Sequence, residues 1–354
     1  SAQFLKEQSV EVQWQKRSLK DFGDQSLEDL SAQFDLLIID HPHMGVAAQS
    51  QCLLPLDNYL SDDVLYSLRQ QSAGPSFDSY HYRGHQWALP IDAAFQSASY
   101  RSDLMDVPIP KTWKEVWELA TKLKARGQYV GMALCPTDAL CTFLSLIAQL
   151  RSPVIAEQSS LIDEASGVQV LELMARCRDT CHPDSLHWNP IQLYDHMAAQ
   201  DDVAYCPMAF NYTNYSRDGF RENLLQFAPA AGGIALLGGA GIAVSSQCKR
   251  PEVAINFALW VCGAEVQRTT YTTAEGQPGN VVAWEDEVCN RLVNNFFRDT
   301  RPTLDQAYVR PRFAAWPAFQ EWLGEEVHAY LVNHSDTKQL IATLNDHYQS
   351  LDRE

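Results

Sequence analysis

The run Asp40-His41-Pro42-His43 places two imidazole side chains one residue apart, directly after the apolar segment Phe34–Ile39. Two histidines with this spacing at the end of a strand can offer two nitrogen ligands to one metal ion. A metal-dependent hydrolase would need further histidines and an aspartate at the ends of other strands. The remaining candidates lie instead in a Pro/Asn-rich loop, on an apparent helix or in a helical tail; they are His182, His187, His196, His328, His334 and His347. Metal-dependent hydrolysis by His41 and His43 is therefore an alternative and not the leading interpretation.

The end of a strand is also the place where open α/β sheets bind their ligands. On this interpretation His41 and His43 contact a small ligand, and so does Asp92, which follows the apolar run Trp87–Ile91. A third interpretation makes the two histidines loop residues that cap the following helix or pack at the surface. We favour ligand contact, because it follows from the strand-end position of these side chains.

The segment Phe210–Tyr215 combines aromatic rings with amide side chains and is dense in turn-forming asparagine, which predicts a loop. Ring faces that stack on a ligand, with amides bonded to its polar edges, are typical of small-molecule sites. Tyr212 and Tyr215 are therefore candidate ligand contacts. The alternative is that both rings pack between a strand and a helix.

Two glycine-containing segments could bring the backbone close to a ligand. Gly239 lies in a Gly-rich turn that leads into a short apolar strand ending near Ser245, and Gln277 lies in the loop 275–280. Glycine permits positive φ and close approach, while the Gln277 amide offers both a donor and an acceptor. We expect both to face the ligand; the alternative for residues 275–280 is a plain helix–helix connection. The glycines do not form a phosphate loop, since no Lys-Ser/Thr follows them.

The sequence contains no pattern typical of nucleophilic catalysis. A GxSxG turn, a cysteine with suitable histidine and asparagine partners, and a carboxylate pair at interpretable spacing are all missing. We therefore expect a binding protein that is not an enzyme and that uses no cofactor.

Composition narrows the class of protein. The 354 residues are enough for about two domains, and 46% hydrophobic against 20% charged residues is typical of a globular chain. A net charge of −17 argues against partners such as nucleic acid or an anionic membrane, which require a basic surface. The most apolar stretch, from Ala133 to Leu150, is interrupted by Asp138 and Thr137, so it does not predict a membrane span.

The nine cysteines do not predict a disulfide framework. Their number is odd, and the one close pair, Cys177 and Cys181, lies one helical turn apart, where a bridge would be strained. Free buried thiols are the favoured interpretation. A protein of a reducing compartment, such as a cytosolic ligand sensor, is therefore an alternative interpretation.

Alternating strands and helices predict an α/β architecture. The strand Val10–Trp14, a helix near Leu27–Gln33 and the strand Phe34–Asp40 predict a parallel sheet at the start of the chain. Further along, the pattern predicts a helix over Trp113–Arg126 that Gly127 ends, a strand over Gln128–Ala133, and helices over Ala139–Leu150 and Leu161–Cys177. We expect short crossovers between two lobes near Ser97–Tyr100, Pro229–Leu236 and Thr300–Val309.

Several segments, in order, resemble bacterial extracellular solute-binding proteins, the ligand receptors of ABC importers. The resembling segments are Phe34–Asp40, Leu53–Leu60, Trp87–Asp92 with Ser99–Leu104, Pro110–Trp117, and Gly238–Ser245 with Arg250–Trp260. The resemblance implies a two-lobed periplasmic-binding-protein-like fold of type II, with the ligand cleft between the lobes. It also implies a periplasmic or extracellular monomer that delivers a small polar solute, such as a sugar, to a transporter permease.

In this architecture we expect the first lobe to comprise residues 1–97 plus 235–304, and the second residues 98–234 plus 305–354. The chain departs from the family at its start, where a helix-like segment, Ala2–Gln8, stands in place of a central strand. We expect that a strand, together with an export signal, precedes Ser1. Arg310 and Arg312 could bind an anionic group, but we favour salt bridges between the lobes.

Overall fold

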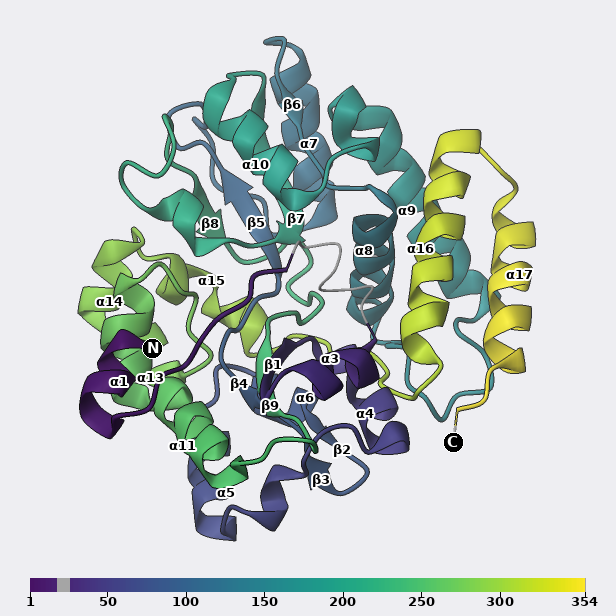
Figure 1. The fold of residues 1–354 in the computed structure, drawn as a ribbon. Helices are drawn as coiled ribbons and strands as arrows, with labels where there is room; N and C mark the ends of the chain where they lie inside the picture. The colour runs from purple at the N-terminus through teal and green to yellow at the C-terminus, as the bar shows by residue number, and fades with distance from the viewer. Residues whose placement is uncertain (18–25, 354) are drawn as a thin grey trace.

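Each lobe of the computed structural model is built around one β-sheet (Figure 1). The structure describes residues 1–17 and 26–353. The first-lobe sheet has the order β1-β9-β4, with β1 Leu36–Ile39, β9 Gly241–Val244 and β4 Leu89–Pro90; a hairpin of β2 (His81–Tyr82) and β3 (His85–Gln86) accompanies it. The second-lobe sheet has the order β6-β7-β5-β8, with β6 Tyr129–Val130, β7 Val203–Phe210, β5 Gln96–Tyr100 and β8 Gln226–Ala228.

The pairing in the first-lobe sheet differs from the predicted parallel arrangement. Both β1 and β4 pair with β9 in antiparallel register. The prediction was wrong because β9 enters after the chain has crossed back from the second lobe, and it runs against its two neighbours. The predicted strand Val10–Trp14 was also wrong, since this segment forms no ladder with another strand.

Helices cover the first-lobe sheet where the sequence predicted them. The Ser26 hydroxyl caps the backbone N–H of Asp29 at the start of α3, and Pro251 begins α11. The helices of this part are α1 Ala2–Gln8, α3 Leu27–Gln33, η1 His41–His43, α4 Met44–Ser50, η2 Leu56–Asn58, α5 Asp62–Gln70, α6 Ser76–Ser79, α11 Pro251–Cys262, α12 Ala264–Val266 and the π-turn η5 Gln267–Tyr271. Phe4 of α1 packs edge-on against Phe257 of α11, with ring centroids 5.0 Å apart, so the start of the chain is held on the first lobe.

The second lobe has the larger helical part. A capping box between Thr112 and Glu115 begins α7 at the predicted residue, and the helix ends before Gly127, whose φ is +74°. Its helices are α7 Trp113–Lys124, α8 Pro136–Gln149, α9 Glu164–Thr180, η3 Pro183–Leu186, α10 Pro190–Ala199, η4 Thr213–Ser216, α16 Trp316–Asn333 and α17 Thr337–Ser350. The two C-terminal helices lie beside α8 and α9 (Figure 1), so the tail belongs to the packing of this lobe.

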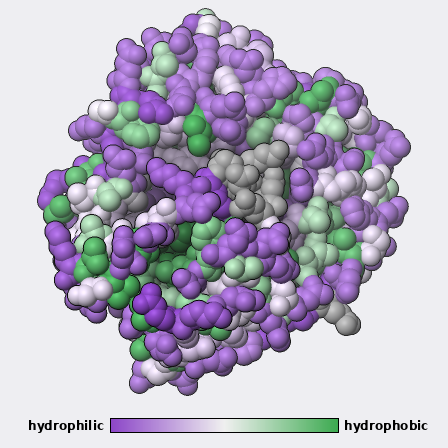
Figure 2. Space-filling view, viewed as in Figure 1, coloured by the Kyte–Doolittle hydropathy of each residue, from purple (hydrophilic) through white to green (hydrophobic). Residues whose placement is uncertain are grey.

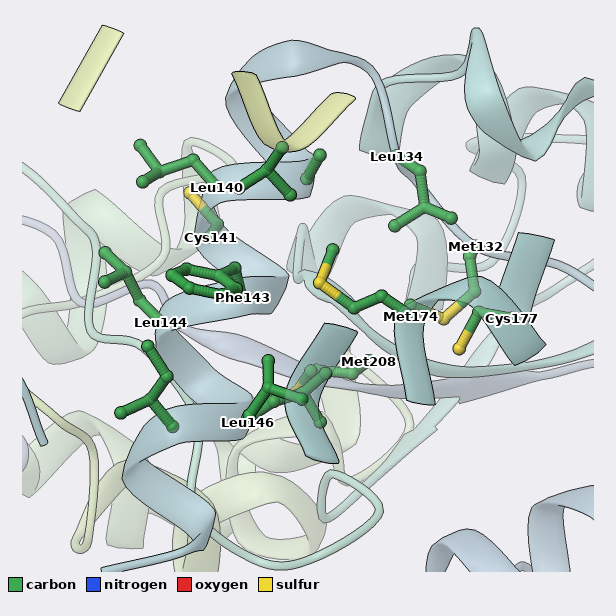
Figure 3. Packing of buried hydrophobic residues seen from close by; sticks show 14 of the residues in the cluster. Met132, Leu134, Leu140, Cys141, Phe143, Leu144, Leu146, Met174, Cys177 and Met208 are labelled. Atoms are coloured by element: carbon green, nitrogen blue, oxygen red, sulfur yellow. The ribbon is translucent and has the colours of Figure 1, made fainter. Parts of the chain in front are cut away.

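Helix α8 is the centre of the second-lobe core. Its residues 138–148 are all buried, and leucine, phenylalanine and methionine side chains from α8, α9 and β7 fill the space around it (Figure 3). Within the described residues no helix has the length and apolar content to cross a membrane.

Helices α13 Val281–Glu285, α14 Glu287–Leu292 and α15 Phe296–Leu304 follow the first-lobe helices in the chain. Phe296 of α15 packs against Phe227 of β8, with ring centroids 4.9 Å apart. The predicted lobe boundaries stay a prediction. From this contact we propose that the third crossover begins before Phe296 instead of after residue 304.

Three segments that connect the lobes run side by side and form the hinge. Phe95 bridges to Leu237 and Leu236 to Tyr308. The backbone N–H of Gly238 donates to the Ala94 carbonyl at 2.7 Å, and that of Leu237 to the Tyr308 carbonyl at 2.8 Å. These hydrogen bonds join residues far apart in the sequence into one short strip of backbone.

The edge of β1 that does not face β9 borders a groove of about 1100 Å³. Residues 10–17 form the opposite wall, and hydrophobic atoms lie at the bottom of the groove (Figure 2). The expectation that a strand precedes Ser1 stays a prediction.

We expect Leu144→Ala to lower the free energy of unfolding by about 2–5 kcal/mol, because the fully buried side chain leaves a cavity in the second-lobe core. Leu150→Ala is the matched control, since Leu150 ends the same helix and is 41% exposed; it should cost about 0.5 kcal/mol or less. Urea denaturation followed by circular dichroism measures both. Equal losses would contradict the assignment of α8 as the core helix.

Candidate ligand-binding site at the hinge

Asp92 lies on the first crossover, between the two sheets. Its backbone N–H donates to the Ala240 carbonyl at 3.1 Å, and it bridges to Pro278. Gly239 has φ +102°, and a Cβ on it would lie 2.6 Å from the Asp92 carbonyl oxygen, so only glycine fits there. The predicted pair Asp92 and Gly239 is thus in direct contact, with the glycine allowing the close approach.

The carboxyl of Asp92 is partly buried and lacks a compensating charge. Burial raises its pKa to about 7, and no cation or hydrogen-bond donor of the described residues counteracts that shift. A carboxylate held this way has unused acceptor capacity. It can therefore accept hydrogen bonds from a ligand.

A second carboxyl approaches from the other lobe. Asp138 lies in the first turn of α8, is 5% exposed, and has a pKa that burial raises to about 7. Its one hydrogen bond among the described residues is with the Cys135 thiol, at 3.1 Å. Sequence analysis noted Asp138 only as an interruption of an apolar run, and that interruption was the signal that could have identified it.

Tyr212 lies within the electrostatic influence of both carboxyls. Burial raises the pKa of its phenol, and the charges of Asp138 and Asp92 raise it further. The ring is partly exposed and meets Tyr194 edge-on at 6.5 Å. Two acceptor carboxyls and an aromatic face from different lobes form an arrangement that can bind hydroxyl groups and stack on a ring.

His41 and His43 lie in η1, at the end of β1. His41 is fully buried, and neither ring nitrogen has a partner with hydrogen-bond geometry, although Nδ1 is 3.0 Å from Asp40 Oδ1. Burial lowers the pKa of His41 to about 4, against the opposing charge of Asp40. Burial also lowers the pKa of the partly buried His43. His41 is therefore neutral at pH 7, and its two unpaired nitrogens are enclosed by protein, so they can bond to a ligand only when the site opens.

The Asp40 carboxylate is committed to protein contacts. Burial opposes its ionisation, but the charges of Arg310 and His41 outweigh this and hold the pKa of Asp40 well below its usual range. Arg310 Nη2 donates to Asp40 Oδ2 at 2.9 Å, across the lobes. Arg312 Nη1 donates to the carbonyls of Asp78, Ser79 and His81. Arg310 therefore forms a salt bridge of the kind that we favoured, whereas Arg312 bonds to backbone carbonyls.

Tyr80 connects the histidine end of β1 with Asp92. Its hydroxyl donates to the Ile39 carbonyl at 3.3 Å, and its ring is 6.3 Å from that of His41. Burial raises the pKa of Tyr80, and the charges of both Asp40 and Asp92 add to the rise. Sequence analysis missed this residue, because a tyrosine between two turns carries no distinctive pattern.

Two of the predicted contacts have their polar groups bonded within the protein. The Gln277 amide donates to the Ala93 carbonyl at 2.8 Å and to Asn211 Oδ1 at 2.9 Å, and it accepts from the Thr213 N–H at 2.9 Å. The Tyr215 hydroxyl donates to Asp195 Oδ1 at 2.8 Å, on the far side of the loop. The structure therefore places Asp92, Gly239 and Gln277 beside one another at the hinge, with Gln277 bonded to Thr213, the neighbour of Tyr212. Tyr212 and Tyr215 both pack against Tyr194, with ring centroids 6.5 Å and 5.2 Å away.

Among the described residues, one group of three histidine or acidic side chains has converging ligand atoms, and it consists of His182, His196 and Asp202 in the second lobe. No third ligand of this kind meets His41 and His43 in that part of the chain. The hydrolase alternative thus lacks an arrangement there that would support it.

Comparison with known proteins places the chain in a family. Residues 1–288 match the family described as bacterial extracellular solute-binding protein. The chain belongs to that family. A maltotriose-binding protein of Pyrococcus abyssi (strain GE5 / Orsay) is 34% identical over 116 residues, which make up 32% of this chain and 24% of that protein. The chain thus matches about a quarter of the length of this relative.

Solved structures of this family share the fold. The maltose-bound MalE3 of T. maritima superposes with a TM-score of 0.77 at 17% identity, over 90% of this chain and 84% of that one. The GacH receptor of Streptomyces glaucescens GLA.O, whose structures include a complex with acarbose, gives 0.80 at 17% identity, over 98% and 92%. The likeness confirms the predicted two-lobed periplasmic-binding-protein fold.

We expect Asp92→Asn to stabilise the ligand-free protein at pH 8. The folded-state pKa of about 7 lies above the unfolded value of about 3.9. The folded state therefore binds more protons between pH 4 and 7, and stability falls as pH rises through that range. Removing the charge should raise the free energy of unfolding at pH 8 by about 1–3 kcal/mol, a range reduced for partial exposure, and change little below pH 4.

Urea denaturation at pH 4 and pH 8 measures this difference. Asp346→Asn is the matched control, since Asp346 lies exposed on α17. If Asp92→Asn destabilises the protein at pH 8, the carboxylate is not held unpaired in a desolvated position.

Proposed function

We propose that this protein binds a neutral carbohydrate between its lobes and delivers it to the permease of an ABC importer. The observation that carries the proposal is a pair of desolvated carboxyls, Asp92 and Asp138, that have no cationic partner among the described residues and whose charges both act on the partly exposed Tyr212. Sugar hydroxyls donate hydrogen bonds to such carboxylates, and the apolar face of a sugar ring stacks on an aromatic side chain.

The charge of the site selects the class of solute. Two desolvated carboxylates in a chain of net charge −17 would repel an anionic ligand. A cationic solute would be compatible with the same charges. The relatives named for maltotriose, maltose and acarbose favour a neutral oligosaccharide.

The hinge supplies the conformational step. Asp92 is on the first crossover and Asp138 is on the second lobe, so a ligand that bonds to both draws the lobes together. Such a ligand shifts the population toward the closed form by its differential affinity for it. The proposed contacts are Asp92, Asp138, Tyr212, the Gly239 backbone, and His41 with His43 at the first-lobe end; Gln277 and Tyr215 position the loop that carries Tyr212.

Experiment distinguishes a periplasmic receptor from a cytosolic ligand sensor. The nine cysteines, all in the described part of the chain, are free thiols, and this favours a cytosolic ligand sensor over a periplasmic receptor. The family itself is extracellular. We propose a monomer outside the cytoplasm, and fractionation of cells that express the full-length natural gene tests its location.

We expect Tyr212→Ala to weaken carbohydrate binding by about 1–3 kcal/mol, the usual cost of removing an aromatic anchor. Isothermal titration calorimetry with maltose, maltotriose and longer maltodextrins measures the loss. Tyr66→Ala is the matched control: Tyr66 is 66% exposed on α5 and is not a proposed contact, so its loss should leave both affinity and thermal stability unchanged.

Small-angle scattering should show a smaller radius of gyration when the parent protein is saturated with the ligand. An unchanged radius together with parental affinity in Tyr212→Ala would rule out closure around this ring.

We expect this protein to show no metal-dependent hydrolysis of carbohydrate. After treatment with EDTA the protein should bind carbohydrate as before, and incubation with maltodextrin should release no shorter sugars by chromatography. His41→Ala and His43→Ala should lower affinity only. Hydrolysis that requires added metal and disappears in both variants would establish the hydrolase instead.

A further inference from the structure

Three metal-ligating side chains converge in the second lobe, away from the hinge. His182 precedes η3, His196 lies on α10, and Asp202 directly precedes β7. His196 Nε2 is 2.7 Å from Asp202 Oδ1, and His182 Nε2 is 3.3 Å from Asp202 Oδ2. One ligand atom from each of the three lies within 4.8 Å of the others.

The rings are held in place by packing. Trp188 stacks on His182 at 4.7 Å between centroids with 14° between planes, and lies 4.6 Å from the His196 ring. The backbone N–H of His182 donates to the Val130 carbonyl at 2.8 Å, and that of Tyr129 to the Asp202 carbonyl at 2.6 Å. Three separate segments are thus fixed against the β6–β7 pair, so the ligand atoms converge without large movement.

We propose that His182, His196 and Asp202 bind one divalent transition-metal ion, of the class of Zn²⁺. Two imidazoles and a carboxylate are a donor set that this class prefers, whereas Ca²⁺ and Mg²⁺ require oxygen ligands. The three side chains are 12%, 23% and 39% exposed, in the order named. The ion can therefore enter from solvent and keep a water molecule as a further ligand.

Coordination requires a change of tautomer in both rings. The Asp184 N–H donates to His182 Nδ1 at 3.2 Å, which places the proton of neutral His182 on Nε2. When Nε2 binds the ion, that proton moves to Nδ1, which then gives up the hydrogen bond from the Asp184 N–H and needs an acceptor; Asp184 Oδ2, 4.0 Å away, can supply it after a small approach. Asp184 is therefore a positioning residue of the site. His196 requires only the same shift, since its contact with Asp202 is through Nε2.

The site lies away from Asp92 and Gly239 at the hinge, but it is linked to the second-lobe carbohydrate contacts. His196 and Tyr194 both lie on α10, and the Tyr194 ring is 6.5 Å from that of Tyr212. The carbonyl of Trp188, whose ring stacks on His182, accepts a hydrogen bond from the N–H of Cys135, the partner of Asp138. The proposed role of the ion is to join three segments at the end of the second lobe, and metal titration without sugar tests it separately from the proposed function.

The test uses the full chain, stripped with EDTA and titrated with Zn²⁺ alone by calorimetry and with Co²⁺ alone by visible absorption. We expect one equivalent of Zn²⁺, a rise in melting temperature, and Co²⁺ d–d bands without an intense thiolate band. His196→Gln and Asp202→Asn should each lose at least tenfold in Zn²⁺ affinity, and Asp184→Asn about tenfold. Circular dichroism verifies that each variant is folded.

His187→Gln is the matched control, because His187 is exposed in the same loop and outside the cluster; its affinity should equal that of the parent. The proposal is overturned if the stripped protein binds no Zn²⁺, if folded His196→Gln and Asp202→Asn bind it as the parent does, or if a thiolate band places the ion on cysteine.

Discussion

The strip of backbone hydrogen bonds between the three crossovers is the constraint on which the rest of this structure depends. Leu237 bonds to Tyr308, and Gly238 to Ala94, so segments from three parts of the chain share one hinge. Because all three must stay paired, relative motion of the lobes is limited to small changes in the crossover dihedrals. Asp92, which is bonded to Ala240 beside the first-lobe strand β9, therefore keeps its position relative to the first lobe, while Asp138 on α8 moves with the second.

Polar groups at the hinge divide into two kinds. The Gln277 amide and the Asp40–Arg310 ion pair have all their major contacts within the protein, and they hold loops of one lobe against the other. Asp92 and Asp138 are nearly without partners and are desolvated, which lowers the stability of the ligand-free protein. Such a cost is typical of positions selected for binding. The presence or absence of partners within the protein therefore distinguishes structural from ligand-contacting polar residues better than burial alone.

Local patterns predicted several helices and indicated the family. The capping box at Thr112, the Pro-Glu start of α11 and the periodicity of α3 are local features, so they can be identified without tertiary contacts. The parallel first-lobe sheet and the strand Val10–Trp14 were wrong for a common reason. Strand direction and pairing depend on the order in which distant segments enter the sheet, and β9 enters from the second lobe.

Sequence by itself determined that residues 210–215 form a polar aromatic loop and that Asp92 and Gly239 lie near strand ends, because turn chemistry and backbone freedom are local. Tertiary structure alone decided that the charges of Asp92 and Asp138 both act on Tyr212, while Tyr215, three residues later, bonds to Asp195. It also decided that the buried carboxyl of Asp138 has only the Cys135 thiol as a hydrogen-bond partner among the described residues. The physical reason is that burial and electrostatic field are sums over residues distant in the chain, which no local pattern encodes.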